Sequence, residues 1–102
     1  MKQLERTLEA RCRRYAKQQG WLARKLNGLG FRSWCDRMFI PPKLTGLRIG
    51  TKPQVLFIEF KREGHEPTPA QAAHHVDLRA RGQHVVVVTS FEQFKIVLGG
   101  YG

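Results

Sequence analysis

The sequence has few cysteines, few acidic residues and no long apolar run. A membrane-spanning helix needs roughly 18–20 consecutive apolar residues, and no segment of this chain approaches that length. The N-terminal residues MKQLERTLEARC also contain no apolar signal core behind their basic residues. We therefore expect a protein that is neither secreted nor bound to a membrane.

Cysteine occurs only at Cys12 and Cys35, and neither belongs to a CxxC motif or to a Cys/His pair at metal-ligand spacing. Isolated cysteines of this kind are typical of reduced thiols in a reducing compartment. The pattern predicts free thiols and argues against a zinc site.

The shortage of acids is the largest departure from an ordinary soluble composition. Eight Asp and Glu face eighteen Lys and Arg, which gives a formal net charge of +10. Residues 1–52 hold thirteen of the basic residues and three acids, whereas residues 53–102 hold five of each. A basic surplus confined to one half of the chain predicts a polyanionic partner such as nucleic acid.

A chain of 102 residues is long enough for one small domain, and we expect a single domain over residues 1–102. Apolar periodicity, helix caps and Gly/Pro breaks predict an α/β protein with the order α-β-β-β-α-β-α. The expected elements are a helix at 2–19, strands at 20–27, 35–40 and 55–61, a helix at 68–81, a strand at 84–88 and a helix at 90–98. The last strand should run parallel to the one before it, through a right-handed crossover.

The segment 55–61, VLFIEFK, has the strongest strand character, and its apolar residues on both faces predict a central position in the sheet. The two-residue period of a strand places Glu59 and Lys61 on one face. One interpretation is a strand-end salt bridge. Burying a carboxylate among apolar residues is costly unless a partner or a metal compensates it, which favours a functional role.

A second carboxylate, Asp36, begins the β-like run that precedes this strand. Taken alone, an Asp after such a turn is an ordinary turn former. Together with Glu59 and Lys61, it would complete a site of two carboxylates and one lysine. Convergent oxygen ligands suit Mg²⁺ or Mn²⁺, which activate water and neutralise charge on a phosphoryl oxygen.

These motifs resemble a known family. The runs SWCDRMFI (33–40), FIEFKREG (57–64) and PTPAQ (67–71), followed by a helix and HVVVV, are similar to the virus-type replication-repair nuclease (VRR-NUC) domain of the PD-(D/E)xK superfamily. The resemblance implies a restriction-endonuclease-like core, with a mixed central β-sheet flanked by helices. It also implies metal-dependent cleavage of DNA, with Asp36 and Glu59 as metal ligands and Lys61 as the catalytic lysine.

The same resemblance implies further site residues. Family members carry a glutamate on the first helix, and the spacing to Gly20 favours Glu9 over Glu5 as a metal ligand. Gln71 matches a glutamine near the family's site, and it also fits a capping box with Thr68. Cys35 stands where the family usually has proline, which affects the positioning of the aspartate that follows it.

The basic half supplies candidate DNA contacts at Arg13, Arg14, Lys17, Arg24, Lys25, Arg32 and Arg37. Phosphate contacts carry no sequence code, so we expect recognition of DNA shape, and weaker binding at higher salt. By resemblance we expect a homodimer that acts on branched or junction DNA in phage or bacterial replication and repair, in the cytoplasm and without a small-molecule cofactor. The alternative is a non-catalytic, basic nucleic-acid-binding module.

Two groups of residues have simpler interpretations. The adjacent residues His74 and His75 cannot both face one metal, so we interpret the pair as partly a solvated helix face. Trp21, Phe31 and Trp34 could stack on unpaired bases, although core packing or a subunit contact is the more common use of such aromatic residues.

Overall fold

Three helices and four strands follow one another in the predicted order within residues 2–26, 33–42 and 54–100, which the computed structural model describes. They are α1 (Lys2–Gln18), β1 (Leu22–Lys25), β2 (Arg37–Ile40), β3 (Leu56–Phe60), α2 (Pro69–Ala80), β4 (His84–Val88) and α3 (Phe91–Gly99). None of the helices in these ranges is long and apolar enough to cross a membrane.

The four strands form one mixed sheet in the order β1-β2-β3-β4. β1 pairs with β2 and β2 with β3 in antiparallel fashion, whereas β3 and β4 are parallel. A parallel pair needs a crossover connection, which α2 provides. The predicted interior position of β3 and its parallel pairing with β4 are both confirmed.

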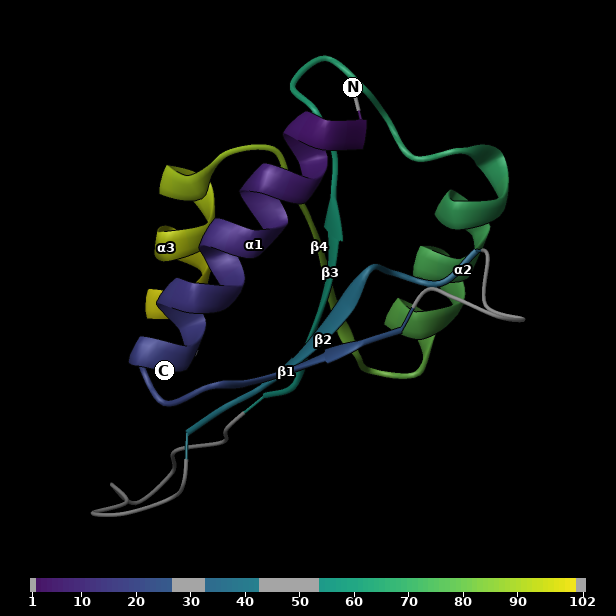
Figure 1. The fold of residues 1–102 in the computed structure, drawn as a ribbon. Coiled ribbons are helices and arrows are strands. Elements are labelled where there is room, and N and C mark those ends of the chain that lie inside the picture. The colour runs from purple at the N-terminus through teal and green to yellow at the C-terminus, as the bar shows by residue number, and fades with distance from the viewer. Residues whose placement is uncertain (1, 27–32, 43–53, 101–102) are drawn as a thin grey trace.

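The sheet lies between two helical layers, with α1 and α3 on one face and α2 on the other (Figure 1). The alternation of side chains along β3 divides its residues between these layers. Leu56, Ile58 and Phe60 join the larger apolar cluster, which includes residues of α1 and α3. Phe57 packs against the smaller cluster on the α2 side. Glu59, two residues further on, therefore faces α2.

Aromatic rings fill the centre of the larger cluster. Phe39, Phe60 and Phe94 are almost completely buried, and the Phe39 and Phe94 ring centroids lie 5.2 Å apart in an edge-on arrangement. Burial of an aromatic side chain of this size is worth roughly 1.5–3 kcal/mol. Trp21 and Ala23 also pack in this cluster, so Trp21 is a core residue and is not exposed for base stacking.

Local signals in the sequence determine where the helices begin and end. Gly20, at a φ of 91°, ends α1 in a left-handed conformation that glycine adopts readily. The Trp21 amide then bonds to the Ala16 carbonyl at 2.9 Å, in a Schellman arrangement. At the start of α2, Thr68 and Gln71 form the predicted capping box.

The outer edge of β4 is covered by two side chains. Arg79 Nη2 donates to the Val85 carbonyl at 3.0 Å, and Gln93 Nε2 donates to the Val87 carbonyl at 3.1 Å. Carbonyl groups on an edge strand are otherwise available to a further strand. These contacts therefore protect this edge of the sheet from strand addition.

Candidate active site

Asp36 lies where β2 and β3 stop pairing. The register between the two strands ends at the pair Arg37 and Ile58. Beyond it, Asp36 Oδ2 accepts the Phe60 amide at 2.7 Å, and the Asp36 carbonyl accepts the Leu26 amide at 3.0 Å. These two hydrogen bonds hold the Asp36 carboxylate beside the end of β3.

Glu59 is the buried acid of the site, with only 1% of the residue exposed. Its Oε2 lies 3.6 Å from Lys61 Nζ, and its Oε1 lies 3.1 Å from His75 Nε2 on α2. Glu59 and Lys61 thus share a face of the chain, as the strand period predicts. The structure adds an imidazole to this pair.

The carboxyl groups of Asp36 and Glu59 both keep their protons to a higher pH than usual, because their pKa values are raised. Burial raises the pKa of Asp36 from 3.8 to about 6, although the hydrogen bond from the Phe60 amide lowers it in part. The nearby charges of Glu59 and Glu9 raise this pKa further. Burial also raises the pKa of Glu59, against the opposing effect of Lys61.

This electrostatic pattern indicates that Asp36 and Glu59 lie close enough for their charges to repel each other. A bound divalent cation would remove the repulsion and favour both ionised forms. Carboxylate oxygens are the ligands that Mg²⁺ and Mn²⁺ prefer. The donor set present here therefore fits such an ion.

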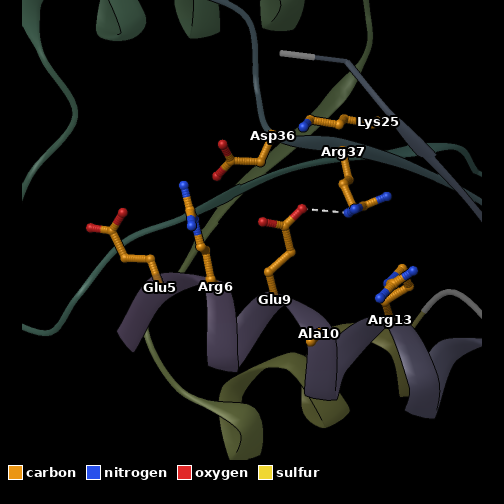
Figure 2. A pocket seen from close by; sticks show the side chains of 8 residues that line it. All are labelled: Glu5, Arg6, Glu9, Ala10, Arg13, Lys25, Asp36 and Arg37. Atoms are coloured by element: carbon orange, nitrogen blue, oxygen red, sulfur yellow. Dashed lines mark hydrogen bonds and ion pairs between the residues drawn. The ribbon is translucent and has the colours of Figure 1, made fainter. Parts of the chain in front are cut away.

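A pocket of about 500 Å³ opens next to Asp36, between α1 and the sheet (Figure 2). Figure 2 shows side chains of α1 extending from the helix toward Asp36, Arg37 and Lys25. The lining combines four cationic and three acidic side chains with one alanine: Glu5, Arg6, Glu9, Ala10, Arg13, Lys25, Asp36 and Arg37. The cationic side chains can attract an anionic substrate, and the acidic side chains can bind metal cations.

The two acids of α1 that line this pocket have different partners. Glu9 forms an ion pair with the Nε of Arg37 (Figure 2). Glu5 Oε1 lies 3.4 Å from the amide nitrogen of Arg62, directly after Lys61. Both acids thus reach the strand end that carries the candidate site.

The three residues predicted to bind metal do not form one compact group. Glu9 is held by Arg37, and the mutual effect of Asp36 and Glu59 is electrostatic. Within the described part of the chain, a compact group of potential metal ligands is formed instead by Cys35, Glu59 and His75. Their ligand atoms all lie within 4.8 Å of one another. The role of Glu9 as a metal ligand remains a prediction.

The predicted DNA-contacting residues divide into two groups. Arg13, Lys25 and Arg37 line the pocket. A second group is exposed outside it and comprises Arg14, Lys17 and Arg24. Arg32, like the candidate stacking residue Phe31, lies outside the described residues. The pocket also contains Arg6, which lies seven residues before Arg13 on the same side of α1.

The structure also bears on the predictions for Gln71 and for the pair His74 and His75. Gln71 uses its side-chain oxygen to accept the Thr68 amide at 2.9 Å, so the capping role is confirmed and a catalytic role is still a prediction. The interpretation of the histidine pair as a solvated face is wrong for His75, which is buried against Glu59. His74 points elsewhere, and its ring centroid lies 4.5 Å from that of Trp34.

A mixed sheet between helices, with an acid before β2 and an E-x-K sequence at the end of β3, defines a nuclease of the restriction-endonuclease-like class. A solved structure described as "VRR_NUC domain" matches with a TM-score of 0.77 and 29% sequence identity, over 97% of this chain and 98% of that chain. "Putative nuclease p44" of Acyrthosiphon pisum secondary endosymbiont phage 1 is 34% identical over 68 residues, which cover 66% of this chain and 70% of that protein. No family model matches the sequence. The chain belongs to the VRR-NUC nuclease family.

Proposed function

We propose that this nuclease is a Mg²⁺- or Mn²⁺-dependent DNA endonuclease that hydrolyses phosphodiester bonds, with a preference for branched DNA. The observation that carries the proposal is the position of Asp36 beside the end of β3, which carries Glu59 and Lys61. Two carboxyl groups with raised pKa values and a lysine thus lie around the end of β3, and one of these groups, Asp36, also lines the pocket.

Asp36 and Glu59 are the residues that would hold the divalent ion, with Glu9 as a third ligand from α1. When bound, the ion supplies Lewis-acid stabilisation of the negative charge that develops on the phosphate during hydrolysis. Asp36 is suited to this role because the Phe60 amide fixes one of its oxygens. The Arg37 ion pair keeps the Glu9 carboxylate facing the same pocket.

Lys61 is the residue that acts on the reacting groups. Its ammonium group lies 3.6 Å from Glu59, and its side chain retains 15% exposure, so it can reach a substrate at the protein surface. A fixed cation at this position stabilises charge on the phosphate or orients the attacking water. Gln71, on the first turn of α2, would assist near the same site.

DNA binding follows from the cations around the pocket. Arg13, Lys25 and Arg37 lie closest to the candidate site, and Arg14, Lys17, Arg24 and Arg32 would extend the contact along the phosphate backbone. Contacts of this kind read the path of the backbone and not the sequence of bases. Affinity should therefore fall steeply as salt rises.

The proposed preference for branched DNA rests on the family resemblance and on a paired arrangement of sites in a dimer. The described residues of one chain form a single candidate cleavage site, so a homodimer is the arrangement that could cut both strands of a junction. The phage origin of the 34% identical relative supports a role in phage replication and repair, in the cytoplasm of a bacterial or infected cell. Because Arg79 and Gln93 protect the β4 edge, the dimer would form through another surface.

A substrate panel tests this proposal. Labelled duplex, flap and four-way DNA would be incubated with the protein in Mg²⁺, in Mn²⁺ and in EDTA, and binding would be measured in parallel. We expect metal-dependent cleavage that is strongest on four-way DNA, in paired nicks. Binding without cleavage in either metal would instead identify a non-catalytic module. Random single nicks by a strict monomer would exclude the junction-cutting dimer.

A further inference from the structure

A second group of potential metal ligands lies on the α2 side of the sheet. It consists of Cys35, Glu59 and His75, which come from the segment before β2, from β3 and from α2. Their ligand atoms all lie within 4.8 Å of one another, and the three residues are only 0, 1 and 3% exposed. Three different kinds of donor thus meet at one buried point.

The chemistry of this group differs from that of the carboxylate site. A thiolate, an imidazole and a carboxylate are the donors that Zn²⁺ prefers, whereas Mg²⁺ and Mn²⁺ disfavour sulfur. In a tetrahedral zinc site the donor atoms are separated by roughly 3.5 Å. The observed separation of 3.1 Å between His75 Nε2 and Glu59 Oε1 lies close to this value.

We propose that Cys35, Glu59 and His75 form a binding site for a thiophilic divalent ion such as Zn²⁺, with a fourth coordination position left for water. The sequence argues against a zinc site, because no cysteine and histidine lie at ligand spacing along the chain. In the folded protein, however, α2 packs against the strands and brings His75 close to Cys35.

The surroundings of the site favour a bound cation. Cys35 packs in an apolar cluster with Leu78 and Val85, so bulk solvent would have little access to the thiolate side of the ion. A thiolate and a carboxylate would balance the double charge of Zn²⁺. The nearby cations Lys61 and Arg79 repel a bound cation and therefore lower its affinity.

This site shares Glu59 with the proposed catalytic centre. An ion held by Cys35 and His75 would keep the Glu59 carboxylate on the α2 side, where it already contacts His75, and away from a metal ion at Asp36. Zn²⁺ would then act as an inhibitor, and this consequence rests on the proposed nuclease function. The binding of Zn²⁺ itself does not depend on that function.

Titration of the protein with Co²⁺, a spectroscopic substitute for Zn²⁺, tests the site directly. The wild-type protein should develop a near-ultraviolet thiolate-to-cobalt band and visible bands of tetrahedral cobalt, and Zn²⁺ should displace both. Cys35→Ser should lose the thiolate band, and His75→Gln should weaken binding about tenfold or more. Circular dichroism would verify that each variant is folded.

Two matched variants provide the controls. Cys12→Ser removes the other buried cysteine, and His74→Gln removes the histidine adjacent to the ligand. Both should bind Co²⁺ as the wild type does. The proposal would be contradicted if the wild type showed no thiolate band, or if the band survived in Cys35→Ser. Because this readout requires no DNA, it is independent of the cleavage assays.

Discussion

Asp36 should make the protein less stable as pH rises, and Asp36→Asn should remove this effect. Burial raises the pKa of Asp36 from 3.8 to about 6. Between these pH values the unfolded chain loses the proton while the folded protein keeps it, so stability falls with rising pH. A tenfold change in an ionisation constant corresponds to about 1.4 kcal/mol, so the loss is about 3 kcal/mol above pH 6.

An asparagine at this position can still accept the Phe60 amide, but it does not ionise. In metal-free buffer at pH 8, we expect Asp36→Asn to be about 1–3 kcal/mol more stable than the wild type, with the advantage disappearing toward pH 4. Urea unfolding across this pH range measures the difference. Added Mg²⁺ should stabilise the wild type more than the variant, because ligand binding to the folded state raises stability.

The control for this experiment is Asp77→Asn, which makes the same charge change at an exposed position. The Asp77 side chain is 58% exposed and pairs with Arg81, so its loss should change stability by less than about 0.5 kcal/mol at any pH. The reasoning would be refuted if Asp36→Asn were less stable than the wild type at pH 8. A stability difference that did not vary with pH would also refute it.

Three further predictions concern the core, a helix cap and the DNA contact. Phe94→Ala should cost about 3 kcal/mol or more in urea unfolding, because it leaves a cavity among the core rings, whereas Ile96→Ala at a 77% exposed position should have little effect. An equal response of the two variants would contradict the core assignment. Thr68→Ala should cost about 1 kcal/mol by losing the α2 cap, and no change in thermal unfolding would show that the capping box is not stabilising. Arg13→Ala should weaken DNA binding for all sequences and reduce the slope of log affinity against log salt by about 1, and an unchanged slope would exclude a phosphate contact.

The fold was predictable because each element carries a local signal. Each of these signals acts over a few residues. Gly20 ends α1, Thr68 and Gln71 begin α2, and an apolar run forms β3. The structure confirms all three elements. The face shared by Glu59 and Lys61 follows from the strand period alone. Patterns of this kind do not depend on distant parts of the chain.

The contacts between elements were less predictable. Nothing near His75 in the sequence indicates that α2 would place it on Glu59, because the helical period leaves the rotation of α2 undetermined. The proximity of Cys35 to Glu59 and His75 also depends on how α2 packs against the sheet. The pairing of Glu9 with Arg37 likewise requires α1 to cross the start of β2, which short-range spacing does not specify.

The most direct test of the central claim is the single-turnover rate at which Glu59→Gln cleaves four-way DNA in Mg²⁺. We predict a loss of about two orders of magnitude or more with DNA binding retained, whereas Glu63→Gln, at an exposed position, should cleave as the wild type does. Cleavage by Glu59→Gln at the wild-type rate, or wild-type cleavage that persists in EDTA, would contradict the assignment of this site.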